Sequence, residues 1–352
     1  MRQDLSAAFA DQALSCEALG SPFLGQLMCC LPELLHHAPR LSALYAAWPG
    51  DPSSRAASLP LRLAGGLHAL VRAEQASALA RAYPPDPVGE LAPALAATLA
   101  AQDGWPCDWV QSPPQTNEVG RSAVLLAAAT ALTARLGLPL HLSELGASAG
   151  LNLNFDRYAM PVGSGTLGQA GSAVVLTPAW GGAAPELSGL RIAGRRGVDL
   201  NPPDPQSEGE RLLAYLWPDQ PARLTRLAGA LRIAAEHPVT VDRGDAAGWL
   251  EARLNSPWPG ACHLVYHTIA HQYFPSETQA RIRRAMEAAG ARATAGAPLA
   301  WLGMEADSLP GGAGVTLRFW PGDLRLTLGR AGFHGQWVEW SGLGEASLPS
   351  EP

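Results

Sequence analysis

An apolar segment that ends in a glycine-containing turn is the feature that most constrains the fold of this chain. Leu138–Leu145 has the composition of a strand, Gly146–Gly150 that of a tight turn, and Leu151–Tyr158 that of a helix start. A strand followed by a turn and a helix begins a βαβ unit, whose strands pair in parallel. We therefore expect a parallel sheet in this part of the chain.

The segments that follow repeat the alternation of strand and helix. Strand-like patterns cover Leu190–Leu200, Val239–Val241, His263–Ile269 and Leu299–Met304. Helical patterns cover Glu118–Leu136, Glu208–Trp217, Ala222–Glu236, Ala246–Leu254 and Ser276–Gly290. This order predicts an α/β domain of Rossmann-like type, a mostly parallel sheet with helices on both faces.

Two further segments, Val315–Trp320 and Gln336–Trp340, have no helix between them. We expect them to pair with each other and to add an antiparallel edge strand to the sheet. The Rossmann-like domain would span residues 111–345. A stretch rich in Gly, Ser and Pro, Pro161–Pro185, predicts an insertion near 160–187 that carries one short hairpin.

Residues 1–110 have a different pattern. Leu, Ala and Met recur at helical spacing, and Pro and Gly interrupt the stretch without any strand-like alternation. We expect an all-helical N-terminal region that serves as a cap or lid. The proline-rich segment Ser112–Glu118 is predicted to be a loop, and Thr116 or Asn117 within it can cap the helix predicted to follow.

The basic residues of the chain exclude several kinds of enzyme. All 25 are Arg, and none is Lys. A P-loop nucleotidase, a pyridoxal-phosphate enzyme and a protein kinase each need a Lys for their chemistry. The net charge of −6, without a basic run, also disfavours nucleic acid as a partner.

The cysteines and the N-terminus indicate where the protein works. Five cysteines form no CxxC pair, which favours reduced thiols over a disulfide framework. Met1–Ser6 contains an acidic residue and no apolar core follows, unlike a signal peptide. Ser122–Ala134 is apolar but too short to span a membrane. We expect a cytoplasmic protein with no membrane partner, and the sequence does not give its oligomeric state.

The turn and two later acids predict a ligand site at the carboxyl edge of the sheet. Gly146 and Gly150 would let the backbone approach a ligand, with Glu144 and Ser148 beside it. Asp199 ends the second strand, where an acid accepts ribose hydroxyls. Asp245 follows the third strand, where an adenine edge would lie, and Asn152 follows the turn. Ligands of open α/β sheets bind at this edge.

This pattern resembles the class I S-adenosylmethionine-dependent methyltransferases over roughly residues 115–340. The resemblance implies a cofactor, S-adenosylmethionine, held by Glu144, the Gly146–Gly150 turn, Asp199 and Asp245. Two features depart from the family pattern. Asp199 follows Glu144 by 55 positions, whereas about 20 is usual in a compact unit, and Ala147 and Ser148 stand where a second Gly is common.

Four motifs resemble, more narrowly, an uncharacterised bacterial family, the domain-of-unknown-function family 2332. They are Pro113–Arg121, Glu144–Leu153, Trp217–Gln220 and Val265–Thr268. The resemblance spans nearly the whole chain. It implies the fold and brings no established activity.

The same turn also fits the G-x-S-x-G nucleophile elbow of a serine hydrolase. Ser148 would attack, and Asp245 with His267, His271 or His334 would give the right chain order for a triad. The helical pattern upstream and the lack of a His-Gly-Gly loop disfavour this hypothesis. A third hypothesis is a non-catalytic fold that binds a nucleotide or a partner.

Four residues are candidates for the substrate side of the site. Asn117 and Arg121 would reach over the cofactor, and Arg121 could hold a carboxylate as a bidentate fork. Tyr266 and His267, at the end of the fourth strand, would position or deprotonate the substrate. His267 and His271 are spaced for a metal only on a helix, so we expect no metal. The function predicted is methyl transfer to a small-molecule substrate.

Overall fold

The computed structural model describes residues 3–54, 56–85 and 87–344. The chain divides into two compact units. A helical unit contains the described residues up to Thr116 together with Ser207–Thr225, and an α/β unit contains Asn117–Gln206 and the described residues from Arg226 onward. The segment 207–225 thus belongs with the helices, although it lies within the span predicted for the α/β domain.

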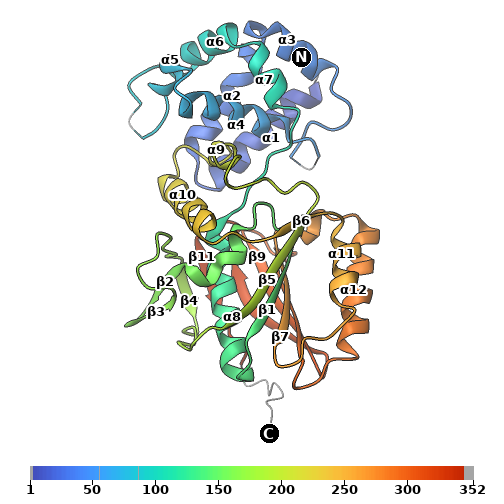
Figure 1. Ribbon diagram of the computed structural model, residues 1–352. Coiled ribbons are helices and arrows are strands. Elements are labelled where there is room, and N and C mark those ends of the chain that lie inside the picture. Colours follow the sequence, from blue (N-terminus) through green and yellow to red (C-terminus); the bar gives the residue numbers. More distant parts are fainter. Residues whose placement is uncertain (1–2, 55, 86, 345–352) are drawn as a thin grey trace. The chain divides into compact units, whose positions relative to one another are not determined.

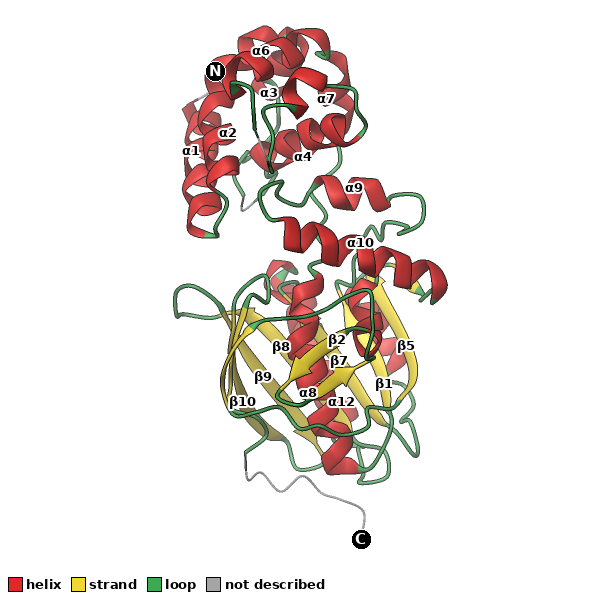
Figure 2. Ribbon diagram, turned by 90° about the vertical axis from the view of Figure 1, so that its left-hand side faces the viewer, coloured by secondary structure: helices red, strands yellow, loops and turns green. Residues whose placement is uncertain are grey.

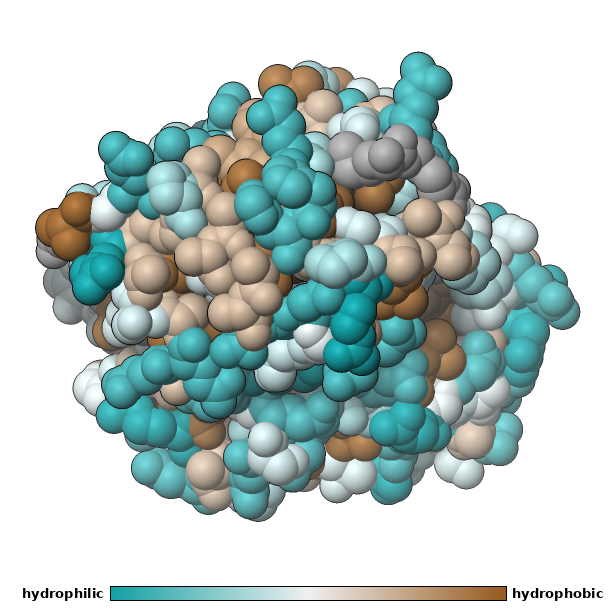
Figure 3. All heavy atoms as spheres, turned by 90° about the horizontal axis from the view of Figure 1, so that it is seen from above, coloured by the Kyte–Doolittle hydropathy of each residue, from teal (hydrophilic) through white to brown (hydrophobic). Residues whose placement is uncertain are grey.

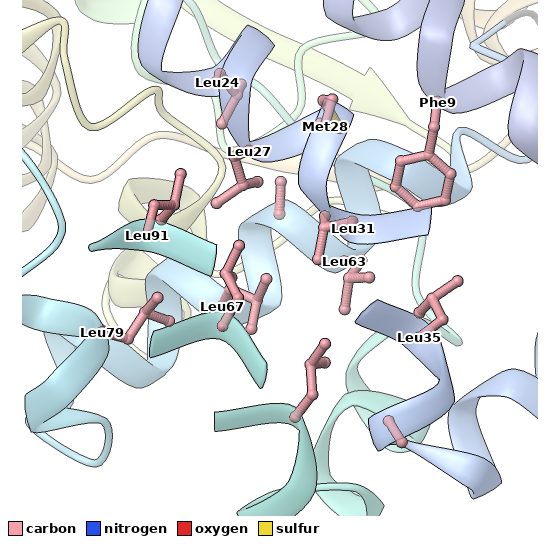
Figure 4. Close-up of a cluster of buried hydrophobic side chains, with 14 of the residues drawn as sticks. Phe9, Leu24, Leu27, Met28, Leu31, Leu35, Leu63, Leu67, Leu79 and Leu91 are labelled. Carbon is pink, nitrogen blue, oxygen red and sulfur yellow. The ribbon is translucent and has the colours of Figure 1, made fainter. Parts of the chain in front are cut away.

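The helical unit packs short helices around one apolar core. Its elements are α1 (Gln3–Ala18), α2 (Pro22–Leu34), η1 (Leu35–His37), α3 (Pro39–Ala46), α4 (Leu59–Arg72), α5 (Ser77–Ala80), α6 (Leu91–Ala101), α7 (Gly104–Trp109) and α9 (Gly209–Ala214). Figure 4 shows leucines of α2, α4 and α6 meeting Phe9 and Met28 in this core. Trp217, which follows α9, is buried in the same cluster. The prediction of an all-helical N-terminal region is confirmed.

Buried polar groups of the helical unit bond to backbone carbonyls. Arg62 donates to the carbonyl oxygens of Ala57 at 2.6 Å, Val110 at 2.8 Å and Gln111 at 3.0 Å. His68 Nδ1 lies 3.1 Å from the carbonyl oxygen of Ala214 and 3.0 Å from that of Leu216. These contacts join segments that are distant in the sequence, so the polar groups hold the unit together.

The α/β unit is built on a nine-stranded sheet with the order β4-β11-β10-β9-β8-β7-β1-β5-β6. Its strands are β1 (Leu140–Leu145), β4 (Ala179–Gly182), β5 (Ile192–Asp199), β6 (Val241–Arg243), β7 (Cys262–Thr268), β8 (Leu299–Ala306), β9 (Ala313–Trp320), β10 (Leu324–Ala331) and β11 (Trp337–Trp340). Neighbouring strands pair in parallel along β6-β5-β1-β7-β8. They pair antiparallel along β8-β9-β10-β11. This is the predicted Rossmann-like α/β fold.

Helices cover both faces of the parallel strands. Figure 1 shows α8 (Ser122–Leu136) on one side of β1, β5 and β7, and α11 (Ala246–Arg253) and α12 (Ser276–Gly290) on the other. Val265 of β7 and Leu145 of β1 belong to the core under α11 and α12. The short helix η3 (Leu151–Arg157) follows the turn after β1, and η4 (His271–Tyr273) follows β7. Helix α10 (Pro221–Glu236) begins in the helical unit and ends in the α/β unit.

The prediction of one closing antiparallel pair is wrong. The strand β10 lies between β9 and β11 and pairs antiparallel with both. Its alternation, Leu324-Arg-Leu-Thr-Leu, is that of a strand with one buried face. The insertion contains the expected hairpin, β2 (Ala159–Val162) with β3 (Gly165–Gly168), but it also supplies β4, which pairs in parallel with β11.

The predicted cap of the helix after the proline-rich loop is also wrong. Glu118 is the N-cap of the first turn, η2 (Val119–Arg121), and its side chain accepts from the Gly120 amide. Asn117 instead accepts a hydrogen bond from the Leu151 amide at 2.9 Å. The C-terminal end of α8 is as predicted, because Gly137 adopts a left-handed conformation there with φ of 66°.

The span Val119–Leu136 is, among the described residues, the one helix long and apolar enough to cross a membrane. Its hydropathy is 1.3, and 83% of it is buried inside the protein. A buried core helix of a globular protein can have the same length and composition. On the face that Figure 3 shows, hydrophilic residues are interspersed with hydrophobic ones.

Candidate functional site

The strand order reverses at β1, which pairs with β5 on one side and with β7 on the other. Strand β6 follows β5 in the chain and lies beyond it in the sheet, and β8 follows β7 and lies beyond it on the other side. The carboxyl ends of β1, β5 and β7 therefore meet at one edge, where open α/β sheets bind ligands. This switch point places Glu144, Asp199 and Tyr266 near one another.

The turn after β1 is held in a conformation that favours glycine. Gly146, Ser148 and Gly150 have φ values of 70°, 51° and 72°. A Cβ atom added to Gly146 would lie 2.6 Å from the Ala270 Cβ, and one added to Gly150 would lie 2.7 Å from a methyl group of Val241. Protein atoms therefore fill the space beside both glycines. The glycines shape the turn by their conformation and by packing against its neighbours.

The backbone amides of the turn already have acceptors within the protein. Gly146 and Ala147 both donate to the carbonyl oxygen of Val198, at 2.9 and 3.0 Å. The Ser148 amide donates to Asp199 Oδ2 at 2.9 Å, and Asp199 Oδ1 accepts from the Asn201 amide at 2.9 Å. The Ser148 Oγ atom, in contrast, is buried and has no hydrogen-bond partner among the described residues. The turn thus presents an unsatisfied hydroxyl and a carboxylate rather than a row of amides.

Glu144 is a buried carboxyl with little to stabilise its charge. Only 2% of the residue is exposed. Its one hydrogen bond in the described part of the chain is a long one, 3.4 Å, from the Tyr266 hydroxyl. Burial raises the pKa of Glu144 well above its ordinary value; the bond from Tyr266 and the charge of Arg121 act against this rise, and the charge of Asp199 adds to it. A cationic or proton-donating ligand would relieve this desolvation.

Three asparagine and serine contacts hold the segment that follows the turn. Asn152 donates from Nδ2 to the Glu118 carbonyl at 3.3 Å and accepts from Ser122 Oγ at 2.8 Å. Asn117 Oδ1 accepts from the Leu151 amide. Asn117 and Asn152, predicted as binding residues, therefore connect the start of α8 to η3 in this structure.

Arg121 joins two loops at the same edge. Its Nη1 atom donates to the carbonyl oxygen of Thr268 at the end of β7, and its Nε atom donates to that of Phe333 between β10 and β11, both at 2.9 Å. Arg121 lies close enough to Glu144 for its charge to lower the pKa of that carboxyl. Part of its hydrogen-bonding capacity is thus committed to the backbone.

Asp245 follows β6 as predicted, but its carboxylate faces two helices. Its Oδ2 atom caps α11 by accepting from the Gly248 amide at 2.9 Å, and it lies 3.5 Å from Arg281 Nη1 of α12. Its Oδ1 atom lies 3.4 Å from Thr278 Oγ1. Among the described residues its carboxylate contacts neither Glu144 nor Asp199, although the Gly244 amide beside it donates to the Asp199 backbone carbonyl.

The two candidate catalytic residues of β7 point to opposite faces of the sheet. Tyr266 pairs in register with Glu144 and contacts it on the α8 side. His267 shares the other face with Val265, the side covered by α12. Successive strand residues alternate between faces. The structure therefore separates Tyr266 from His267.

His267 belongs to a hydrogen-bonded chain that the sequence did not suggest. Its Nδ1 atom lies 2.7 Å from Glu305 Oε1, and Trp301 Nε1 donates to its Nε2 atom at 3.0 Å. Because Trp can only donate, Nδ1 carries the proton of the neutral ring. Glu305 also accepts from the amides of Ala270 and His271, each at 3.1 Å. Burial acts to raise the pKa of Glu305, but its bond with His267 and the bonds from the amides of Ala270 and Gln272 lower it overall.

Glu305 is the main site residue that the sequence prediction missed. The predicted strand Leu299–Met304 stops one residue before it, whereas β8 continues to Ala306. An acid at the end of a strand beside a histidine-bearing strand was the available signal. Trp301 and Glu305 lie four residues apart on β8, so they share a face of the sheet, and it is the face of His267.

The contacts of Ser148 do not include a histidine. Its amide bonds to Asp199, and its Oγ atom has no partner in the described part of the chain. The histidine best supported by an acid, His267, is instead bonded to Trp301. Among residues 3–54, 56–85 and 87–344, no three His, Cys, Asp or Glu side chains gather as metal ligands.

Comparisons with known proteins give a family and no activity. The model of one protein family, described as "Uncharacterized protein conserved in bacteria (DUF2332)", matches residues 6–340. No curated protein and no solved structure matches the chain. The match extends through both the helical and the α/β units. The chain therefore belongs to the DUF2332 family.

Proposed function

We propose that this protein binds S-adenosylmethionine at the switch point and transfers its methyl group to a small molecule. The observation that carries the proposal is the pairing of a buried, poorly solvated carboxyl at the end of β1, Glu144, with a second acid at the end of β5, Asp199. Acids at these two strand ends suit a ligand that has a positive charge and hydroxyl donors.

The turn favours a ligand without phosphate groups. Phosphates bind where several backbone amides are unpaired and point at the anion. Here the amides of Gly146, Ala147 and Ser148 are bonded to Val198 and Asp199. The neighbouring Asp199 carboxylate would also repel an anion. A sulfonium nucleoside fits this arrangement better than a dinucleotide or a nucleoside triphosphate.

The residues present would divide the work of holding such a cofactor. Asp199 would accept from ribose hydroxyls with the lone pairs that its two amide bonds leave, and the orphaned Ser148 Oγ would gain a partner. Glu144 would face the cationic part, with Tyr266 fixing its carboxyl. When bound, the cofactor supplies an electrophilic methyl group. The protein contributes position and exclusion of water.

The test is isothermal titration of the whole protein with S-adenosylmethionine, with ATP as a comparator. We expect binding of S-adenosylmethionine and none of ATP. Asp199→Asn should weaken binding by about tenfold or more, because one charge-assisted hydrogen bond contributes about 1.5–3 kcal/mol. Asp245→Asn, which keeps the helix cap, tests whether that acid also contacts the ligand.

Glu251→Gln is the matched control, because Glu251 is a carboxylate of α11 that pairs with Arg281 and contacts no candidate site residue at the turn. It should bind the cofactor as the parent does. If the folded parent protein takes up ATP but not S-adenosylmethionine, the proposal fails and a non-catalytic nucleotide-binding role replaces it. If it binds neither, the switch point is not a site for either ligand.

A further inference from the structure

A cavity of about 590 Å³ lies on the α12 side of the sheet, separate from the Glu144 side. Residues of β7, β8, β9 and β10 form its floor, and Arg283 and Glu287 of α12 form one wall. Figure 2 shows β8, β9 and β10 side by side in the sheet. Its volume falls within the range of about 300–1,000 Å³ that is usual for small-molecule sites.

Strand register explains how the floor is built. One cross-strand row runs from His267 through Gly303 and Thr316 to Thr327. A second row, two residues along each strand, contains Trp301, Arg318 and Arg325. Because Gly303 has no side chain, the floor beside His267 stays open; a Cβ there would lie 3.0 Å from the imidazole. The cavity is thus a regular product of the sheet.

The charges that line this cavity are mainly positive. Three arginines line it, Arg283, Arg318 and Arg325, against one carboxylate, Glu287. Arg318 is occupied, since it donates to Glu287 Oε1 at 2.8 Å and to both carboxylate oxygens of Asp323.

The other two guanidinium groups have fewer carboxylate contacts than Arg318. The nearest carboxylate oxygen to Arg325 that forms an ion pair is Asp323 Oδ2, at 3.7 Å. No carboxylate in the described part of the chain forms an ion pair with Arg283. Two guanidinium groups of different elements therefore face the cavity with little compensation.

The inner part of the cavity is aromatic. The His271 ring stacks on that of His267, with centroids 4.7 Å apart and an interplanar angle of 21°. Trp301 meets both rings edge to face. Burial lowers the pKa of His271 to about 4, with the neighbouring His267 adding to the effect, so the ring is neutral at pH 7. The Nε2 atom of His271 has no hydrogen-bond partner among the described residues.

We propose that this cavity binds a small organic carboxylate, whose charged group lies between Arg283 and Arg325 and whose body lies against Trp301 and His271. The guanidinium fork matches a carboxylate, and the aromatic side chains offer an apolar surface to the rest of the molecule. This site is distinct from the proposed cofactor site, and it does not depend on S-adenosylmethionine binding.

The experiment compares benzoate with benzyl alcohol, which has the same ring and no charge. Binding is followed through the Trp301 indole N–H resonance and by calorimetry on the full chain. We expect benzoate to bind with a Kd of about 1 mM or tighter and benzyl alcohol at least tenfold more weakly. The double variant Arg283→Gln/Arg325→Gln should lose about 10–100-fold in benzoate affinity.

Arg284→Gln is the matched control, because it removes the same charge from the same helix at a residue that does not line the cavity. It should leave benzoate affinity within about twofold of the parent. Equal binding of benzoate and benzyl alcohol overturns the proposal. It is also overturned if the Trp301 resonance is unmoved up to the solubility limit of benzoate, or if the double variant, shown to be folded by circular dichroism, keeps its affinity.

Discussion

The helical unit and the α/β unit both bury ionisable side chains, but the two side chains are bonded differently. In the helical unit, Arg62 donates to three backbone carbonyls at 2.6–3.0 Å. In the α/β unit, Glu144 is 2% exposed against 7% for Arg62, yet among the described residues it has one hydrogen bond, of 3.4 Å. A buried charge that is fully bonded within the protein holds a fold together. One that is poorly bonded is a candidate for contact with a ligand.

The comparison predicts that Arg62 is essential to its own unit. Arg62→Leu would leave the carbonyls of Ala57, Val110 and Gln111 without their donor, and should destabilise the helical unit by about 3 kcal/mol or more. Hydrogen exchange of the α4 amides would measure this. The control is Arg72→Leu, whose ion pair with Glu210 is exposed and should contribute less than about 1 kcal/mol. Equal effects in the two variants would contradict the structural role of Arg62.

The opposite outcome is expected for Glu144→Gln. The folded-state pKa of this carboxyl lies above its unfolded value, so stability is lost as pH rises from about 4.5 toward the folded-state pKa. The neutral Gln avoids this cost and should stabilise the α/β unit by about 1–3 kcal/mol at pH 7, with no gain at pH 4.

The measurement is the free energy of unfolding from exchange of the β1 amides at the two pH values. S-adenosylmethionine affinity should fall in the same variant, because the carboxylate is lost. A variant that is less stable than the parent at pH 7 would show that Glu144 holds the fold, as Arg62 does.

Buried histidines give the smallest expected effect, and here the two units should behave alike. Burial lowers the pKa of His68 to about 4 and that of His263 to about 3, from 6.5. The unfolded chain therefore binds more protons, and stability is lost as pH falls below about 6.5. Each histidine should cost its unit about 1 kcal/mol between pH 6 and pH 5.

Exchange of amides in α4 and in β7 over this pH range would test both histidines. In His68→Gln the loss should shrink in the helical unit alone, and in His263→Gln in the α/β unit alone. A pH dependence that is unchanged in both variants would mean that other groups titrate.

Much of the order of strands and helices in the α/β unit could be predicted, because hydrophobic periodicity and helix-ending residues are local features of the sequence. Gly137 ends α8, and the strands β1, β5, β7 and β8 fall within a few residues of their expected ranges. The strand β4 could not be predicted, because Ala179–Gly182 is a four-residue segment whose partner β11 is far along the chain. Only the folded sheet brings these segments together.

The sequence predicts which residues of the candidate site lie at the ends of strands. It does not predict which partners their side chains bond to. Glu144, Asp199 and the turn reach the expected edge of the sheet. Asn117, expected as a helix cap or substrate ligand, bonds to the Leu151 amide instead, because a tertiary partner outcompetes the local cap. The separation of Tyr266 from His267 follows from strand alternation, so it could have been foreseen.

The division of the chain into units has a consequence for the order in which the protein is made. The helical unit needs residues 207–225, including buried Trp217 and the carbonyls of Ala214 and Leu216 that accept from His68. During synthesis these residues emerge only after β1 to β5. The helical unit therefore cannot finish folding until much of the α/β unit has been made, and a fragment that stops at Thr116 would lack part of its own interior.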